Sequence, residues 1–441
     1  MEEAPVLPAT ALRDQWTAPG DIFSILLILG GDIVQLSIVA LAGGAFTPAT
    51  FSFGWVSYAI TALLGAVGEN RLVRCAPEIP LVVINLQSGY ARANHSWVLA
   101  RLYNTYQYWM PDEVRAFRTK RDEEEGLLGN NINNASGSTH VETTKRDHRA
   151  ALCVAVYRWS RNRASGVPKT DWLWWSGLAA TAVQLGIAAV PLGISGDWTI
   201  LLVTAAGNML AYASASLPQW RQEKWAARRL QGGKSKDVAL TEGNGARHVI
   251  IVLGEEGSLD LEDLATRSPP DLPSTRVFVS ALALLWLALL LTSTGIRANT
   301  WYLLAVGGLG MLHNLVVAGA PRQPACIGLP IELASIKTLA AAEGREGQCE
   351  ETPALFGEEK VMWTLMELED KFEKHGRSLV GEFFPGKMVK WEEDWWNEGD
   401  KVKRRDILTD NKRKQYAKER SRMENKSGMS SSTSKAAASV E

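Results

Sequence analysis

Six long apolar blocks constrain this chain more than any other feature. They cover residues 22–42, 52–68, 172–194, 198–217, 276–296 and 301–320, and the only charged residues inside them are Asp32 and the border residue Arg276. A helix rises about 1.5 Å per residue, so about 20 apolar residues cross a hydrocarbon core of roughly 30 Å. The blocks therefore predict a mainly α, polytopic membrane protein with six transmembrane helices, of which 52–68 is the shortest. A composition of 46% hydrophobic and 22% charged residues hides this pattern, because nearly all the charges lie outside the blocks.

The blocks form three pairs with connectors of only 9, 3 and 4 residues, which predicts three helical hairpins at 22–68, 172–217 and 276–320. The hydrophilic segments then share one side of the membrane: residues 1–21, 69–171, 218–275, 321–426 and 427–441. That side carries 16 Lys and Arg residues near membrane ends, and the other side carries Arg297 alone. Basic loops remain in the cytosol, so both termini are predicted to be cytosolic, at the plasma membrane or an internal membrane.

The cytosolic segments contain strand and helix patterns of their own. Runs at 81–86, 152–159 and 248–254 resemble strands, and 96–110 resembles a helix, which together predict a small α/β layer. The polar insert 119–149 and the stretch 427–441 are predicted to be disordered. In the helical tail, apolar residues recur from Val361 to Phe372 opposite an acidic face, which favours docking on the α/β layer over binding to anionic lipid. Residues 401–414 are interpreted as a solvated helix rather than a contact with the inner leaflet.

Polar side chains inside the blocks are the sharpest candidates for function. Asp32 lies near the middle of the first block, where an ionised group costs about 2.5 to 3.5 kcal/mol, so it is expected to face the bundle interior with a partner or to be protonated. The candidate intramembrane polar cluster is Asp32, Gln35, Gln184, Asn208, His313 and Asn314. Two interpretations remain open: a polar path or proton relay, and interhelical hydrogen bonds that hold the bundle together, which we favour.

An internal repeat is a second hypothesis for the blocks. Val34, Gln35 and Leu36 match Val183, Gln184 and Leu185, and Trp198 to Pro218 align without gaps on Trp301 to Pro321. The third pair has Trp286 where the others have Gln. Three copies of one hairpin and chance similarity between apolar segments both explain these matches.

A basic and aromatic stretch follows the fourth block, and it is interpreted as a lipid-headgroup belt with the bilayer as its partner. Its members are Trp220, Arg221, Lys224, Trp225, Arg228 and Arg229. Nothing else in the chain supports nucleic-acid binding.

Signatures of catalysis, cofactors and metals are weak. Residues 232–235 (GGKS) lack the upstream glycine and the preceding strand of a phosphate loop, and no two histidines have the spacing of a helical metal site. Gly307, Gly308 and Gly310 favour close helix packing over a dinucleotide loop. We therefore assign no catalytic residue, no metal and no cofactor.

Several strings together resemble a family of uncharacterised multipass membrane proteins from filamentous fungi. They are GDIVQLSIVALAGG (31–44), the stretch 46–71, INLQSGY (84–90), SWVLARL (96–102), LCVAVYRW (152–159), and FFPG (383–386) with the later Trp395 and Trp396. The resemblance extends to about residue 396. It implies a fungal membrane protein and brings no activity or ligand.

Three functions remain open. A membrane-anchored regulatory or scaffold protein, with a cytosolic protein partner, is favoured because most of the chain lies outside the blocks and no catalytic motif is present. A small-solute or proton-coupled transporter or channel is suggested by the repeat and by Asp32. A membrane-embedded enzyme is the third possibility, since lipid enzymes often lack simple motifs.

Overall fold

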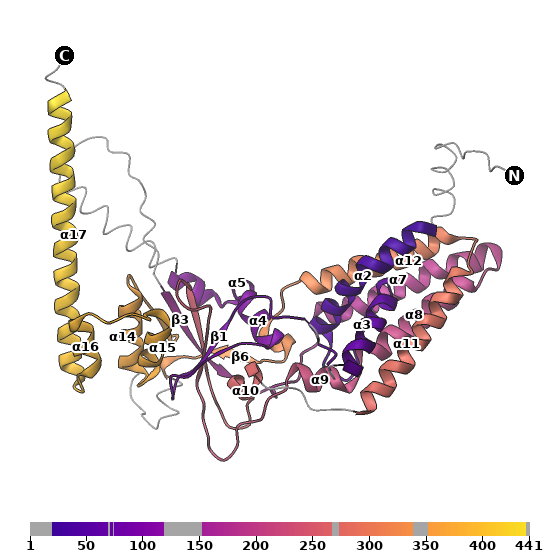
Figure 1. Cartoon of the computed structure of the whole chain (residues 1–441), viewed down its shortest axis with the longest axis horizontal. Helices are drawn as coiled ribbons and strands as arrows, with labels where there is room; N and C mark the ends of the chain where they lie inside the picture. Colours follow the sequence, from indigo (N-terminus) through magenta and orange to yellow (C-terminus); the bar gives the residue numbers. More distant parts are fainter. Residues whose placement is uncertain are drawn as a thin grey trace.

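The chain forms a helical bundle joined to an α/β domain (Figure 1). The computed structural model describes residues 20–68, 71–73, 75–118, 152–266, 273–337 and 352–437. The predicted insert 119–149 and residues 1–19 of the predicted N-terminal tail lie outside them. About 58% of the chain is helical, which confirms the mainly helical fold, but the sheet has seven strands and is larger than the layer predicted.

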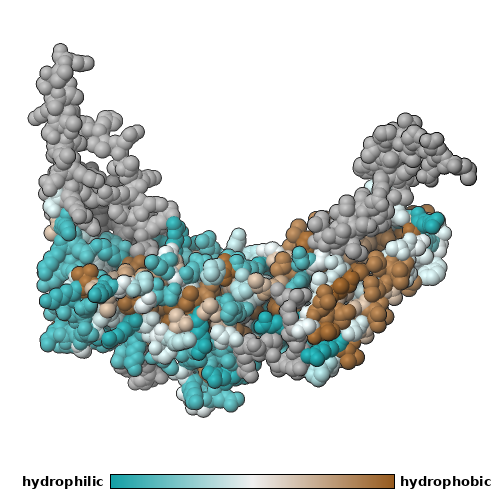
Figure 2. Space-filling model, in the orientation of Figure 1, coloured by the Kyte–Doolittle hydropathy of each residue, from teal (hydrophilic) through white to brown (hydrophobic). Residues whose placement is uncertain are grey.

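Each of the six apolar blocks forms a helix of the bundle. The helices are α2 (Gly20–Leu41), α3 (Gly54–Gly68), α7 (Trp172–Ser195), α8 (Thr199–Ala215), α11 (Pro273–Thr294) and α12 (Thr300–Gly319). Neighbouring contacts run from α3 to α2, α12, α7, α8, α11 and back to α3, so the six helices form a closed ring. Apolar side chains also cover the outside of this ring, whereas the α/β domain is largely hydrophilic on the face shown in Figure 2.

Three of these helices, α7, α11 and α12, are long and apolar enough to cross a membrane. A fourth crossing results if α8 and the following α9 (Pro218–Lys224), which are bent by 40° at a short break, count as one span. Exposed tryptophans lie at helix ends: Trp172 and Trp198 are 62% and 59% exposed. An indole ring in these positions suits the headgroup region of a bilayer.

The sheet of the α/β domain has the strand order β2-β1-β4-β5-β3-β6, and β7 also pairs with β3. Its strands are β1 (Val82–Asn85), β2 (Ala91–Ala93), β3 (Leu152–Trp159), β4 (Val238–Thr241), β5 (His248–Leu253), β6 (Ile331–Leu333) and β7 (Leu355–Glu358). The structure confirms the predicted strands β1, β3 and β5. Only β3 and β5 are parallel, with Cys153 opposite His248.

The two faces of the sheet pack against different partners, because successive side chains of a strand point to opposite faces. Ala155 and Tyr157 of β3 join a core that continues into the helical bundle. Val154 and Val156 of the same strand join a second core under the C-terminal helices. The sheet therefore lies between the bundle and the C-terminal helices, and one continuous apolar core connects it to the bundle (Figure 1).

Shorter helices complete the domain. The bundle face carries α4 (Trp97–Asn104) and α5 (Tyr106–Trp109), with α10 (Leu261–Thr266) beside β1 and β2 and the 3-10 turn η1 (Pro324–Ile327) beside α4. The other face carries α14 (Val361–Lys371), α15 (His375–Phe383) and α16 (Lys390–Asn397), followed by α17 (Lys401–Ala437). Burial of Met362, Leu365 and Leu368 confirms that the tail docks on the sheet. The helix α17 extends into the stretch 427–441 that was predicted to be disordered, of which residues 438–441 lie outside the described residues.

The first pair of helices departs from the predicted hairpin. The C-terminal end of α2 contacts the α/β domain, because Lys224 Nζ donates to Ala42 O at 2.9 Å and Arg322 donates to Ala40 O at 2.5 Å. We call this end of the bundle the sheet end and the opposite one the far end. The connector 43–51, predicted to lie at the far end, therefore starts at the sheet end. Helix α2 runs parallel to α12 and opposite to α7, so the first pair does not repeat the direction of the other two.

Candidate functional site

The chain between α2 and α3 is extended and passes through the middle of the helical ring. We call residues 47–53 the axial segment; all seven are buried. It starts near the sheet end, where Thr47 N–H donates to Ser216 Oγ at 3.0 Å. It ends at Gly54, which contacts Gly30 of α2 about half-way along the length of the bundle. Helix α3 then returns to the sheet end, so residues 42–68 enter and leave the bundle at the same end.

Four residues of the predicted polar cluster converge on this segment. Gln184 Nε2 donates to Phe51 O at 2.7 Å, and Phe51 N–H donates to Asn208 Oδ1 at 3.2 Å. Asn314 Nδ2 donates to Thr50 O at 3.3 Å, and His313 Nδ1 lies 3.1 Å from Thr50 Oγ1. Extended backbone away from water must find hydrogen bonds inside the protein. These side chains supply them, which supports the interpretation as packing bonds.

The other two residues predicted for the cluster lie elsewhere. Asp32 is exposed on the outside of the bundle, which corrects the expectation that it faces the interior, and among the described residues it forms no hydrogen bond or ion pair. Gln35 is half-buried beside Cys75. The physical reason is the rotation of α2: its inner face is formed by Gly30, Val34, Ser37 and Ile38, and positions 32 and 36 fall on the opposite face.

Glycines make room for the axial segment, a role that the sequence analysis missed. A Cβ at Gly310 would lie 1.7 Å from Phe51 O, and one at Gly177 would lie 2.1 Å from Pro48 O. At Gly207 and Gly307 it would meet the rings of Phe51 and Phe53 at 2.5 and 2.1 Å. The prediction of close packing at Gly307 and Gly310 identified the right positions, but their neighbour is an extended chain rather than a helix. Gly308 faces open space.

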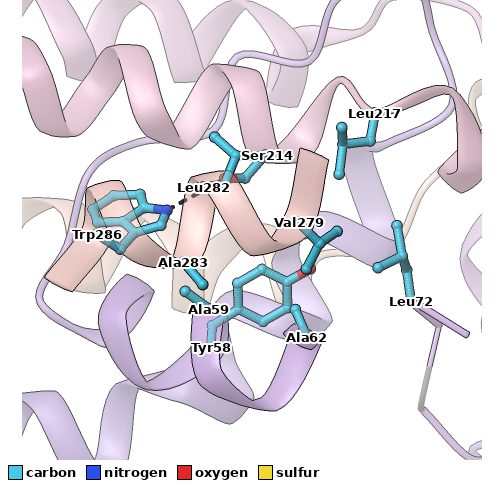
Figure 3. Close-up of a pocket in the computed structure, with 10 residues that line it drawn as sticks. All are labelled: Tyr58, Ala59, Ala62, Leu72, Ser214, Leu217, Val279, Leu282, Ala283 and Trp286. Atoms are coloured by element: carbon cyan, nitrogen blue, oxygen red, sulfur yellow. Dashed lines mark hydrogen bonds between the residues drawn. The ribbon is translucent and has the colours of Figure 1, made fainter. Parts of the chain in front are cut away.

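Aromatic rings close the ring of helices around the axial segment. Trp286 of α11 stacks on Trp55 with ring centroids 5.4 Å apart and on Phe51 at 6.2 Å. Its indole N–H donates to Ser214 Oγ (Figure 3). The neighbouring hollow between α3, α8 and α11 has a volume of about 10 Å³, which holds about one water molecule. This part of the bundle has no room for a larger solute.

Two buried oxygens beside the axial segment have no partner among the described residues. They are Gln184 Oε1 and Thr204 Oγ1, on the facing helices α7 and α8, and both side chains are fully buried. The amide of Gln184 is engaged through its nitrogen, so its oxygen points away from Phe51.

Cations join the bundle to the α/β domain at three helix ends. Arg101 donates to Ala318 O and Ala320 O at 2.9 and 3.0 Å at the end of α12. Lys224 and Arg322 bind the last carbonyls of α2, where positive charge is favoured by the helix dipole. Arg322 also forms a bidentate ion pair with Asp171, the N-cap residue of α7. The three helices are thereby fixed to the domain.

These contacts correct the predicted lipid-headgroup belt. Trp220, Lys224 and Trp225 are buried between the bundle and the sheet rather than exposed to lipid. Helix α9 is bent relative to α8 at the sheet end of the bundle, so these long side chains pack against protein. Arg228 pairs with Asp260, and Arg229 donates to Ser165 O and Gly257 O. Of the six predicted residues, only Arg221 is exposed without a side-chain contact among the described residues.

The largest hollow of those described lies in the α/β domain, under α15 and the start of α17. Its volume is about 650 Å³. A second hollow of about 200 Å³ adjoins it and shares Arg377. We call the two together the Arg377 cleft. It lies on the sheet face that points away from the bundle.

Metal and thiol chemistry find little support in the described part of the chain. No group of three or more His, Cys, Asp or Glu side chains is arranged there to hold a metal ion. Burial raises the pKa of the Cys153 thiol to about 11, so it stays protonated and unreactive at neutral pH. Residues 232–235 form an exposed turn, with Gly232 and Gly233 at φ of 71° and 68°, and no helix follows to bind phosphate.

Relatives of this chain were sought in three comparisons with known proteins. No protein-family model, curated protein or solved structure matches this chain.

Proposed function

We propose that this protein is an integral membrane docking protein, in which the helical bundle anchors the chain and the α/β domain binds a protein partner. One observation carries the proposal. Gln184, Asn208 and Asn314 inside the bundle bond to the axial segment, and the hollow beside Trp286 holds about one water, whereas the α/β domain has a hollow of about 650 Å³. The cations at the sheet end fix this domain to the anchor.

We further infer a membrane topology of five crossings and one re-entrant segment. Helix α2 has 22 residues, about 33 Å, so it reaches from the far end to the sheet end. Residues 42–68 would enter and leave at the sheet end. The N-terminus would then face the side opposite to the α/β domain. With Arg13 placed on the side opposite to the α/β domain, 15 Lys and Arg residues near membrane ends remain on the side of the domain, against Arg13 and Arg297 on the other. The domain therefore still faces the cytosol.

Cysteine labelling tests this topology. In a chain whose four cysteines are replaced by alanine, Ala45→Cys, Ala298→Cys, Lys234→Cys and Thr10→Cys are each treated with a membrane-impermeant maleimide in sealed vesicles. All except Thr10 lie among the described residues and are exposed. Ala45→Cys should react from the same side as Lys234→Cys, and Thr10→Cys from the same side as Ala298→Cys. If all three pairs are instead full hairpins, Ala45→Cys reacts from the same side as Ala298→Cys, and Thr10→Cys reacts from the same side as Lys234→Cys.

A transporter or channel is the second candidate, and the axial segment favours it. Extended backbone and a half-length helix that meet near the middle of a bundle are common at the ion and substrate sites of transporters. The unpartnered Gln184 Oε1 and Thr204 Oγ1 are at that level.

A flux assay separates the two candidates. The purified protein is reconstituted in vesicles, and the fluxes of H⁺, K⁺ and Na⁺ are measured. A docking protein gives the flux of protein-free vesicles, and the protein in nanodiscs captures the same cytosolic protein in replicate experiments, which empty nanodiscs do not. Flux above that background, lost in Asn314→Leu while the protein remains folded, would overturn the docking proposal in favour of transport.

A further inference from the structure

The Arg377 cleft is built from three separate parts of the chain. One wall is the turn after β1, a second is the start of α15, and the third is the junction of α16 and α17. The larger hollow is lined by Gln87, Ser88, Gly89, Glu369, Glu373, Lys374, Arg377, Ser378, Gly399, Lys401 and Arg404. The smaller hollow is lined by the apolar residues Val380, Met388 and Trp396, together with Arg377, Gly381, Glu393 and Asn397. Arg377 stands where the two hollows meet.

Hydrogen bonds fix all three walls. Asn85 Oδ1 accepts from Gln87 N–H and Ser88 N–H at 2.9 and 3.2 Å, which holds the turn. Ser378 Oγ donates to Leu86 O at 2.7 Å and ties α15 to that turn. At the third wall, Arg404 Nε donates to Glu398 O at 2.5 Å. The cleft is therefore formed before any ligand binds, which reduces the entropy lost on binding.

Positive charge dominates the larger hollow. Lys374, Arg377, Lys401 and Arg404 face two carboxylates, Glu369 and Glu373. Glu369 is buried, and its two carboxylate oxygens accept the backbone N–H groups of Lys374 and Arg377 at 2.8 and 3.0 Å, so both oxygens are already engaged. Lys374 has a left-handed backbone with φ of 71°, and its ammonium group has no partner among the described residues.

The other cations keep donors available for a ligand. Arg404 uses one N–H on Glu398 and lies 5.1 Å over the Trp395 ring, and a guanidinium group has five donors. Within the described part of the chain, the guanidinium group of Arg377 makes only one long hydrogen bond, of 3.4 Å, to Trp396 O. The four cations come from two walls, the start of α15 and the junction of α16 and α17, and they line one hollow of about 650 Å³.

This arrangement selects one kind of anion. Phosphate groups commonly bind free N–H groups at a helix N-terminus, but at α15 the carboxylate of Glu369 already occupies them. The headgroups of the bilayer around the bundle are out of reach, because α14 and α15, which contribute to the cleft, lie on the sheet face away from the bundle (Figure 1). Cations on two walls, beside a second hollow that contains Val380, Met388 and Trp396, fit an extended peptide with several carboxylates followed by a bulky apolar side chain.

We propose that the Arg377 cleft is the docking site for an acidic peptide of a partner protein. The carboxylates of the peptide lie along Lys374, Arg377, Lys401 and Arg404, and its apolar side chain enters the hollow beside Met388 and Trp396. This inference rests on the proposed docking function, and it names the partner's chemistry.

Fluorescence anisotropy tests the site on the full-length protein in nanodiscs of phosphatidylcholine, a zwitterionic lipid without net charge. The probe is a labelled peptide with four glutamates followed by glycine and two leucines. Two control peptides replace the glutamates by glutamine or the leucines by glycine. Binding of the probe should weaken at high salt, because exposed charges are screened. The glutamine peptide should not bind, and the glycine peptide should bind more weakly.

Single substitutions locate the peptide. We expect Arg377→Glu to weaken binding at least tenfold and Lys374→Gln to weaken it several-fold. Lys234→Gln removes an exposed lysine elsewhere in the domain and should have no effect. Arg377→Gln, with an intermediate loss, controls for misfolding. Absence of probe binding, or equal affinity of wild type and Arg377→Glu, overturns the site. The docking function would still stand in that case if vesicles show no flux and a cytosolic partner is captured.

Discussion

Alanine at Gly310 should disrupt the centre of the helical bundle. The new methyl group would lie 1.7 Å from Phe51 O and 2.7 Å from Gln184 Nε2, whereas carbon and oxygen normally approach to about 3.3 Å. The axial segment must move by about 1.5 Å, because the obstacle is backbone and not a flexible side chain. That movement breaks the bond from Gln184 Nε2 to Phe51 O and strains the one from Phe51 N–H to Asn208.

The size of the loss follows from three contributions. Overpacking costs about 1 to 3 kcal/mol, and a buried carbonyl left without a donor costs about 1 to 3 kcal/mol. The higher helix propensity of alanine offsets about 1 kcal/mol. We expect Gly310→Ala to lower the free energy of unfolding by about 3 kcal/mol.

Gly308→Ala is the matched control for this prediction. It lies two residues away in α12 and faces open space, so it gains the helix propensity without a clash. Unfolding is followed by tryptophan fluorescence as SDS replaces a mild detergent. If the two variants unfold at the same SDS fraction, the axial segment does not occupy the centre of the bundle and the topology proposed from it fails.

Three further substitutions test a hydrogen bond, an ion pair and a buried histidine. Gln184→Met should lower the free energy of unfolding by about 1 to 3 kcal/mol in the same assay, because Phe51 O loses its donor, and Gln35→Met should not. Arg322→Met should cost about 3 kcal/mol, because the carboxylate of Asp171 loses its buried partner, and adding Asp171→Asn should recover part of that loss. Burial, with Arg118 and Arg247 nearby, lowers the pKa of His248 from 6.5 to about 4, so the folded state favours the neutral ring. The stability that this gives is present above pH 6.5 and is lost as the pH falls towards 4. His248→Phe should therefore flatten the dependence of the melting temperature on pH over that interval.

Hydropathy predicted where the helices lie but not how many cross. All six apolar blocks are helices, because apolar helix formers away from water satisfy their own backbone within each helix. The connector 43–51 was read as a loop at the far end because it is short. Two features of the part that is buried indicated burial instead: residues 47–53 have no charged residue, and they contain Phe51 and Phe53. Gly43 also has a left-handed φ of 120°, and a Cβ there would collide with the Trp225 ring.

The polar residues show a similar division. Gln184, Asn208, His313 and Asn314 bond inside the bundle as expected, since a buried amide or imidazole in an apolar helix needs a partner. Their partner has no signal in the sequence, because the carbonyls of Thr50 and Phe51 look like any other backbone group there. The misplaced Asp32 has the same origin: an apolar helix has apolar residues on all sides, so its inner face cannot be read from the pattern.

The Arg377 cleft was beyond prediction from the sequence. Its cations come from a stretch that reads as an ordinary charged tail, and its opposite wall lies almost 300 residues earlier, at Gln87 to Gly89.

The sequence alone determined which segments are apolar helices, which short runs are strands and that the helix α14 docks on the sheet, because these depend on local periodicity and burial. Only the tertiary structure decided the direction of α2, the course of the axial segment and the meeting of Lys374, Arg377, Lys401 and Arg404 in one cleft. The physical reason is that direction and convergence arise from contacts between residues far apart in the chain, such as Gly310 with Phe51, which leave no periodic signal in either segment.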